Sequence, residues 1–265
     1  MNNSTLKQYF DGHWALVLGA SSGFGEAACL HFAEAGLNIF GVHLDRKATL
    51  ENAERIQSNI KKMGRQVQFF NMNAADDTKR AEAVSAMQSL APKKIKVLMH
   101  SLAFGALKPF IGDDTISKAQ VEMTLDVMAS SLIYWSQDLH NKGLFSDDAR
   151  IFAMTSAGSS RVWKSYGAVS AAKAALESYI RQLALELAPF GVTANAILAG
   201  VTDTPALRKI PGNPEMIEAA TKKNPSKRLT TPQDVAKTLL ALSLPHCSFV
   251  TGNTLRVDGG ENIVE

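Results

Sequence analysis

Tyr166 and Lys173 are the two residues of this chain whose types and spacing most directly suggest chemistry. They stand at the two ends of the segment Tyr-Gly-Ala-Val-Ser-Ala-Ala-Lys. Seven helical steps come within about 20° of two full turns, so both side chains would lie on one face of a helix. A phenol can stabilise an oxyanion, while a nearby ammonium lowers the phenol pKa and can hold a cofactor hydroxyl. An amphipathic helix with a core tyrosine and a solvated lysine would look the same, so the rest of the chain must decide.

The bulk composition is that of an ordinary soluble enzyme. At 265 residues, with 46% apolar and 20% charged residues, the chain suits one large α/β domain with a well-buried core. A net charge of +3 gives no indication of a nucleic-acid partner. Cys29 and Cys247 are too few for a disulfide framework, which fits a reducing cytosol. No apolar run approaches membrane-spanning length, so we expect a cytoplasmic protein without a membrane segment, and we expect no metal site.

Short apolar runs alternate with helical patterns along the whole chain. Strand–helix alternation with nearly continuous apolar strands is typical of a parallel sheet covered on both faces. We therefore predict one α/β domain over residues 1–265, a doubly wound, Rossmann-type sheet of seven parallel strands with helices on both faces. The predicted strands are 15–18, 39–44, 67–70, 97–99, 151–154, 194–198 and 254–257. The predicted helices are about 24–35, 48–63, 77–90, 115–141, 166–188 and 232–243.

One segment, about 204–231, departs from this alternation. It contains four prolines and six basic residues. Ligands bind at the carboxyl ends of the strands in such folds, and mobile loops there often close over them. We predict a substrate lid over this segment, with Ala206, Leu207, Ile210 and Met216 as wall residues.

A glycine-rich turn follows the first predicted strand. Gly19, Gly23 and Gly25 are spaced as Gly-x-x-x-Gly-x-Gly, and a helix follows them. Glycines let the backbone approach a pyrophosphate, which the helix N-terminus stabilises. The same turn could be purely structural, but its position after the first strand of an alternating chain predicts a dinucleotide site. Ser21, Ser22 and Phe24 belong to the same predicted loop.

The end of the second predicted strand should contact the adenosine ribose. It contains both an acid and bases, His43-Leu-Asp45-Arg46. An acid favours the 2′-hydroxyl of NAD and a base favours the 2′-phosphate of NADP, so the signal is divided. Asn73, followed by Ala74, could accept a hydrogen bond from the adenine amino group, and it could also cap the helix that starts near Asp76.

These motifs, with Ser156 and the tail Arg256-Val-Asp-Gly-Gly260, resemble the short-chain dehydrogenase/reductase family from Trp14 onward. Most members carry Tyr-x3-Lys, but here Val169 stands at that tyrosine position and Tyr166 makes a Tyr-x6-Lys pair. The turn after the fourth strand is His100-Ser-Leu-Ala-Phe rather than Asn-Asn-Ala-Gly. Both variants resemble enoyl-acyl-carrier-protein reductases, most closely their divergent, dehydrogenase-like bacterial form.

Several single residues keep two interpretations. His100 could be a buried histidine that shapes the turn, and Phe104 could be core or pocket wall. Ser156 replaces a second tyrosine of the better-known enoyl reductases, and it could bond the substrate carbonyl or only satisfy backbone at the strand end. Met128 stands where many dehydrogenases place an asparagine that supports a proton relay, which makes alcohol–ketone chemistry less favoured.

The resemblance implies reduction of trans-2-enoyl thioesters carried on acyl carrier protein, with Tyr166 as the donor to the thioester oxygen. It also implies that Lys173 holds the nicotinamide ribose, and that Ser101, Leu102, Thr202 and Thr204 contact the cofactor. From His43 and Arg46 we expect NADPH, with NADH still open. The alternatives are a 3-oxoacyl or other carbonyl reductase that uses Ser156 and Tyr166, and an NADP-binding pseudoenzyme or sensor.

Two predictions concern partners. The resemblance implies a homotetramer paired through helices 115–141 and 166–188, and Ile133, Trp135 and Leu185 suit such an interface. An acidic carrier protein should dock on a basic surface near the acyl entrance. The basic residues of the lid segment are the candidates: Arg208, Lys209, Lys222, Lys223, Lys227 and Arg228.

Overall fold

The computed structural model describes residues 3–264 and contains one parallel sheet of seven strands in the order β3-β2-β1-β4-β5-β6-β7. This is the predicted doubly wound architecture. The order reverses direction between β1 and β4, which is the switch point where such sheets bind ligands. The strands are β1 (Trp14–Leu18), β2 (Asn38–His43), β3 (Val67–Asn71), β4 (Ile95–His100), β5 (Phe145–Thr155), β6 (Thr193–Ala199) and β7 (Thr254–Val257).

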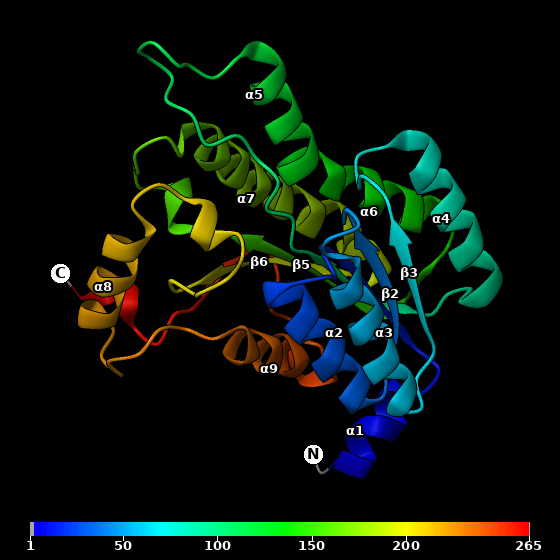
Figure 1. The fold of residues 1–265 in the computed structure, drawn as a ribbon. Helices are drawn as coiled ribbons and strands as arrows, with labels where there is room; N and C mark the ends of the chain where they lie inside the picture. Colours follow the sequence, from blue (N-terminus) through cyan, green and yellow to red (C-terminus); the bar gives the residue numbers. More distant parts are fainter. Residues whose placement is uncertain (1–2, 265) are drawn as a thin grey trace.

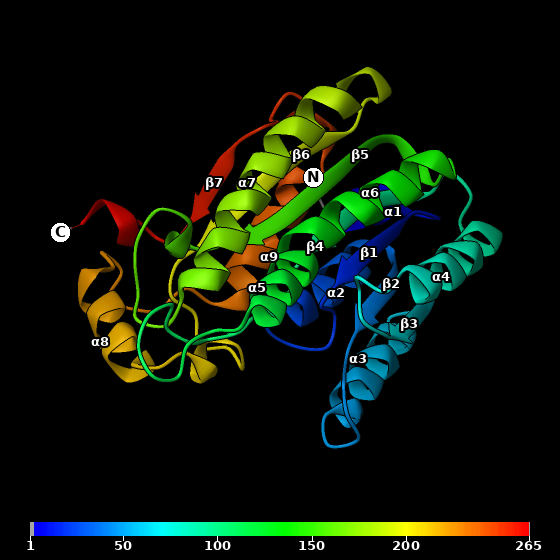
Figure 2. The ribbon, with the colours of Figure 1, turned by 90° about the horizontal axis from the view of Figure 1, so that it is seen from above.

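Helices cover both faces of the sheet, as Figures 1 and 2 show. One face carries α4 (Asp77–Leu90), α5 (Lys118–Leu125), α6 (Ser131–Asn141) and α7 (Gly167–Leu187). The other carries α1 (Asn3–Phe10), α2 (Gly23–Ala35), α3 (Leu50–Lys62) and α9 (Pro232–Leu242). The remaining helix, α8 (Asn213–Lys223), stands apart from both layers near the C-terminus.

Two apolar cores lie between these layers, one on each side of the sheet. The first packs α4, α6 and α7 against one face, and its largest fully buried side chain is Trp135. The second packs α1, α2, α3 and α9 against the other face, with Phe10 and Phe32 fully buried. Successive side chains of a strand point to opposite faces, so a strand buried on both faces is apolar throughout. This explains the continuous apolar runs of the sequence.

The seven predicted strands are all present; the last, 254–257, has the predicted bounds, and the other six have shifted ends. The strand predicted at 151–154 begins earlier, at Phe145. The prediction missed its first residues because they include two aspartates, which interrupt the apolar pattern of a buried strand. The helix predicted at 115–141 is divided: a π-helical turn, Asp126–Ser130, separates α5 from α6. The sequence also gave no indication of α1, whose Phe10 enters the second core.

Trp135 was predicted at a subunit interface, and this is wrong. Its side chain is fully buried within the chain, and its indole nitrogen donates to the carbonyl oxygen of Ala74 at 2.9 Å. Leu185, on α7, is 71% exposed and remains available for an interface. Within residues 3–264 no helix combines the length and hydropathy needed to cross a membrane.

Candidate active site

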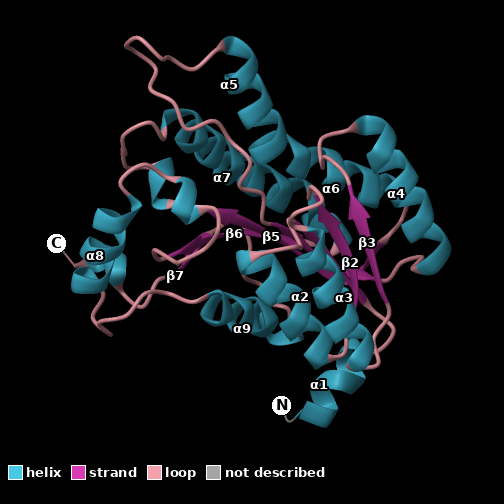
Figure 3. Cartoon of the chain, in the orientation of Figure 1, coloured by secondary structure: helices cyan, strands magenta, loops and turns pink. Residues whose placement is uncertain are grey.

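A cavity of about 690 Å³ lies at the carboxyl ends of the strands. It is lined by the turns that follow β1, β2, β3, β4, β5 and β6, so segments far apart in the sequence meet there. Figure 3 shows the long loops that lead into α5 and that flank α8. The predicted site residues that line this cavity are Gly19, Ser21, Ser22, Gly23, Phe24, His43, Asn73, Ala74, Ser101, Leu102, Ser156, Tyr166, Lys173, Thr202 and Thr204.

The glycine turn at the start of α2 fits a dinucleotide pyrophosphate. Gly19 has φ +90°, and a Cβ there would overlap the carbonyl oxygen of Ser101. A Cβ at Gly25 would overlap the carbonyl oxygen of Gly19, which explains that glycine although it does not line the cavity. Ser22 precedes α2 without a side-chain cap, so the first N–H groups of the helix remain for an anion.

His43 and Leu44, at and just beyond the end of β2, line the part of the cavity where the sequence predicts the adenosine ribose. The Nδ1 atom of His43 lies 2.8 Å from Oδ2 of Asp45. Burial acts to raise the pKa of Asp45, but hydrogen bonds from Ser21, Thr49 and His43 lower it overall, so the carboxylate is charged. Neither Asp45 nor Arg46 lines the cavity, and Arg46 is exposed.

Asn73 does not cap the helix that follows it. The cap of α4 is Asp76, whose carboxylate accepts from the N–H of Lys79 at 2.9 Å. The side-chain oxygen of Asn73 instead accepts from the N–H of Ala75 at 3.1 Å. Asp76 takes this role because it directly precedes the helix, whereas Asn73 lies three residues earlier and faces the cavity.

Tyr166 enters the cavity from the position just before α7. Its hydroxyl donates to Oγ of Ser156 at 3.5 Å, and that oxygen also accepts from the N–H of Gly158 at 3.2 Å. Burial raises the pKa of Tyr166, with a smaller lowering by Ser156. The sequence predicted a pKa lowered by Lys173; the structure gives the opposite direction. The phenol is therefore protonated at neutral pH and available as a donor.

Lys173 is 5% exposed, and its ammonium is held by backbone. The Nζ atom donates to the carbonyl oxygens of Met154 at 2.8 Å and Leu102 at 3.2 Å. Burial lowers its pKa to about 8, and Glu177 opposes this shift. Glu177 lies one helical turn further along α7 and accepts from the hydroxyl of Thr155 at 2.6 Å. Lys173 is therefore mostly protonated at neutral pH and close to its titration range.

The turn after β4 and the π-helical turn form one wall. His100 is fully buried, and its Nε2 lies 2.9 Å from Oγ of Ser131. Burial, with the charge of Lys173, lowers the pKa of His100 to about 3, so the ring is neutral and shapes the turn. Met128, within the π-helical turn, lines the cavity with its thioether. Phe104 is 54% exposed and also lines it, so it is pocket wall rather than core.

The turn after β6 and the segment beyond it form the opposite wall. Thr202 donates through its hydroxyl to the carbonyl oxygen of Gly200 at 2.9 Å. Thr204 lies against the glycine turn: its methyl carbon is 3.4 Å from the position that a Cβ at Gly23 would take. The predicted lid contains a 3-10 turn, Leu207–Lys209, and α8. All four predicted wall residues line the cavity: Ala206, Leu207, Ile210 and Met216.

Comparison with known proteins agrees with this arrangement. A family model described as enoyl-(acyl carrier protein) reductase matches residues 19–262. The chain belongs to this family of short-chain dehydrogenases/reductases. The fold of this family implies a nicotinamide cofactor, and the glycine turn fits one.

The relatives within the family differ in their reactions. A 1-cyclohexenylcarbonyl-CoA reductase of Streptomyces collinus is 27% identical over 94% of this chain and 87% of its own. A 7alpha-hydroxysteroid dehydrogenase of Escherichia coli is 25% identical over 98% of this chain and 97% of its own. The solved structure of an enoyl-[acyl-carrier-protein] reductase (NADH) from Aquifex aeolicus is 25% identical, with a TM-score of 0.84 over 96% of this chain and 98% of that one. The chain is thus an oxidoreductase of this family.

The basic residues of the predicted lid differ in what their side chains contact. Three of them form ion pairs with carboxylates beside them: Arg208 with Asp203, Lys222 with Glu218 and Arg228 with Asp234. Lys227 is exposed and donates to the carbonyl oxygen of Lys222 at 2.9 Å. Lys209 and Lys223 line the cavity. The predicted docking cluster is therefore divided between paired surface charges and cavity-lining charges.

Sequence reasoning missed three charged residues of the cavity: Arg161, Asp258 and Glu261. Glu261 reaches the turn after β6, and its carboxylate accepts from the N–H of Val201 at 3.0 Å. The only signal in the sequence was its place directly after the Asp-Gly-Gly tail. Arg161 lies between two motif residues, Ser156 and Tyr166, in a loop whose course the sequence does not determine.

Proposed function

We propose that the protein reduces trans-2-enoyl thioesters carried on acyl carrier protein. The observation that carries the proposal is the protonated hydroxyl of Tyr166 in a cavity whose far wall is the apolar side of the lid. The family model and two of the relatives described above support the same reaction class. The reaction adds a hydride to Cβ and a proton to Cα of the enoyl group, and the reduced nicotinamide, when bound, supplies the hydride.

The residues of this chain would stabilise the charge that develops on the thioester oxygen. Tyr166 donates a hydrogen bond to that oxygen, where the negative charge appears in the transition state. The ammonium of Lys173, held by two carbonyl oxygens beneath the cavity, adds a positive field and binds the ribose hydroxyls of the cofactor. Phe104, Ile210 and Met216 cover the acyl chain and exclude water.

The test is an assay of the reduction of a crotonyl thioester, in which the loss of absorbance of the reduced nicotinamide measures turnover. Tyr166→Phe should lower turnover by about a hundredfold or more and leave cofactor affinity nearly unchanged, because one oxyanion donor is lost. If Tyr166→Phe turns over as fast as wild type while the chemical step is rate-limiting, Tyr166 has no role in the chemical step. Lys173→Ala should weaken cofactor binding as well as turnover.

A second candidate reaction is reduction of a 3-oxoacyl thioester or another carbonyl. The hydrogen bond of 3.5 Å between Tyr166 and Ser156 favours it, because two hydroxyls could bond one carbonyl oxygen. The similarity to a hydroxysteroid dehydrogenase supports the same class. Met128 argues against it, because a thioether cannot take part in a relay of hydrogen bonds through water. Crotonyl and acetoacetyl thioesters assayed side by side distinguish the two reactions.

We further propose NADPH as the cofactor. His43 occupies the strand end where an acid would bind the 2′-hydroxyl of NAD, and the exposed bases Arg46 and Lys47 follow it. Asp45 is charged and opposes a phosphate, but its carboxylate lies against His43; neither Asp45 nor Arg46 lines the cavity. Charge-assisted bonds from an arginine to a phosphate are stronger than a single hydroxyl bond.

The proposed assembly is a homotetramer. The exposed Leu185 of α7 is an apolar side chain that a second copy could cover. The proposed partner is an acidic carrier protein. Since Arg208, Lys222 and Arg228 already have carboxylate partners, they contribute less to its steering than their number in the sequence suggests.

A further inference from the structure

Three basic side chains line the cavity without a partner of opposite charge. They are Arg161, Lys209 and Lys223, and none of them makes an ion pair or a side-chain hydrogen bond within residues 3–264. Three lid residues that do not line the cavity differ in this respect: Arg208, Lys222 and Arg228 each have a carboxylate within 2.8 Å. Cations that face a cavity without such a partner are suited to an anionic group of a ligand.

The three cations come from one half of the site. Arg161 lies in the loop after β5, whereas Lys209 and Lys223 lie in the lid after β6. The indole nitrogen of Trp163 donates to the carbonyl oxygen of Pro211 at 2.9 Å, which ties that loop to the lid. Arg161 and the lid lysines therefore line the cavity from two segments that contact each other, and we refer to the part of the cavity between these segments as its opening.

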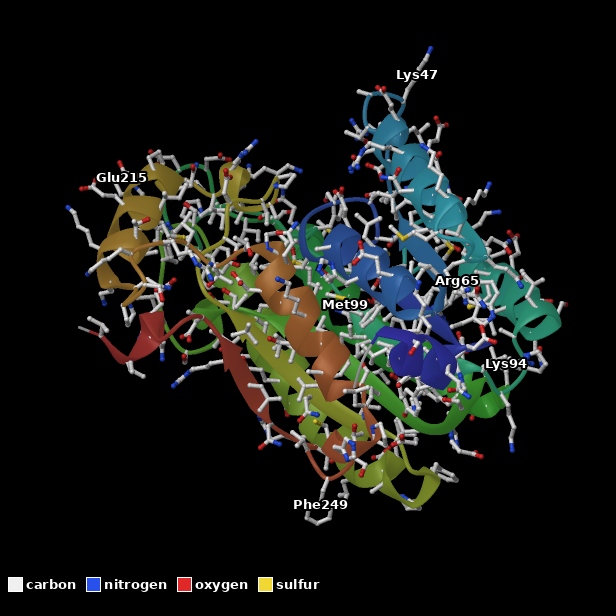
Figure 4. The ribbon with its side chains drawn as sticks, turned by 90° about the horizontal axis from the view of Figure 1, so that it is seen from below. Lys47, Arg65, Lys94, Met99, Glu215 and Phe249 are labelled. Atoms are coloured by element: carbon white, nitrogen blue, oxygen red, sulfur yellow. The ribbon has the colours of Figure 1, made fainter. Side chains whose placement is uncertain are left out.

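The three cations follow other strands than the segments that fit the cofactor phosphates do. The glycine turn follows β1 and the adenosine loop follows β2, in the other half of the sheet. Figure 4 labels Lys47, beyond β2, and Glu215, on α8, on the right and left sides of the view. A cofactor whose pyrophosphate lies at the N-terminus of α2 thus leaves these three cations free for another anion.

Two carboxylates lie among these cations, and both are held by backbone. The carboxylate of Asp258 accepts from the N–H of Gly260 at 3.0 Å and of Asn262 at 3.1 Å. The carboxylate of Glu261 accepts from the N–H of Val201. Burial raises the pKa of Glu261, against the smaller lowering effects of Arg161 and Lys223. Three cations face two carboxylates, so an excess of positive charge remains at the opening.

We propose that Arg161, Lys209 and Lys223 bind the phosphate of a 4′-phosphopantetheine arm whose thioester lies at Tyr166. This rests on the proposed reduction of thioesters. Coenzyme A and acyl carrier protein both present this phosphate, which is the charged group nearest to the thioester in either carrier. An arm that enters between the loop of Arg161 and the lid can place its apolar acyl end against Ile210 and Met216, which line the same cavity. The guanidinium and the two ammonium groups then neutralise the phosphate at the entrance.

The test compares crotonyl-4′-phosphopantetheine with crotonyl-pantetheine, which differ only in the phosphate. Wild type should show the lower KM for the phosphorylated thioester. Arg161→Gln and Lys223→Gln should each shift the ratio of the two KM values by about tenfold, since a hydrogen bond to a charged group contributes about this much. Arg161→Lys should restore part of the ratio. Lys164→Gln is the matched control, because Lys164 is exposed on the same loop and does not line the cavity; its ratio should stay at the wild-type value.

Calorimetry with the saturated butyryl derivatives of the same two arms tests binding without turnover. If wild type binds the phosphorylated arm more tightly and Arg161→Gln removes this preference, the phosphate site is supported. This holds even if no crotonyl thioester is reduced, because the absence of turnover would refute only the enoyl activity. Equal affinity of wild type for both arms, or equal losses on both in Arg161→Gln and Lys223→Gln, overturns it. The same variants are also assayed with crotonyl-coenzyme A and with the crotonyl carrier protein. The rise in KM over wild type should be larger for the carrier that the protein uses.

Discussion

Replacing Lys173 with methionine should change how the stability of the protein depends on pH. Burial lowers the pKa of this ammonium from 10.5 to about 8 in the folded chain. The unfolded chain therefore binds the proton more tightly, so Lys173 destabilises the fold below about pH 8, and this cost is relieved as the pH rises toward the unfolded value. Each pKa unit corresponds to about 1.4 kcal/mol, which gives about 3 kcal/mol at neutral pH.

The pH dependence separates this charge effect from the other consequences of the substitution. Lys173→Met also removes hydrogen bonds to the carbonyl oxygens of Leu102 and Met154. An unmade buried hydrogen bond costs about 1–3 kcal/mol, but this cost does not vary with pH. Between about pH 7 and pH 9.5 the free energy of unfolding of wild type should therefore rise by about 2 kcal/mol relative to Lys173→Met.

Urea unfolding of the cofactor-free protein at several pH values, at one protein concentration, measures this difference. Lys61→Met is the control, because Lys61 is an exposed lysine on α3. The difference between wild type and Lys61→Met should be constant with pH. Parallel pH profiles for wild type and Lys173→Met would refute the reasoning, since they would mean that Lys173 carries the same charge in the folded and unfolded chains.

Three further predictions concern activity, cofactor and assembly. Glu177 raises the pKa of Lys173, so Glu177→Gln should move the alkaline fall of kcat/KM to lower pH, and an unmoved profile would contradict this electrostatic role. Wild type should have the lower KM for NADPH, and Asp45→Ala should strengthen that preference, because it removes a carboxylate that repels the 2′-phosphate; a preference for NADH that disappears in Asp45→Ala would reverse the cofactor proposal. Light scattering at micromolar concentration should give the mass of a homotetramer, and a stable monomer would count against it.

The sequence by itself determined the layered architecture and the family. Strands buried on both faces have to be apolar throughout, and the helices between them have to return the chain to the same edge, so the seven parallel strands could be predicted. Gly19 and Gly25 of the first turn are required by close backbone contacts that a Cβ would not allow. Helical spacing suggested the pair Tyr166 and Lys173, and the other motifs of the chain favoured a catalytic pair over an ordinary amphipathic helix.

Only the tertiary structure decided how the charged groups are paired. Which carboxylate pairs with Arg208, and that none of residues 3–264 forms an ion pair with Arg161, depends on loops whose course follows from packing against distant segments. The sequence predicted Trp135 at an interface because periodicity does not distinguish a helix face buried within the chain from one buried by a partner. The direction of the Tyr166 pKa shift likewise depended on burial, which outweighs the lowering effect of the hydrogen bond with Ser156. Local periodicity specifies the elements, whereas the free energy of a charge depends on everything that surrounds it.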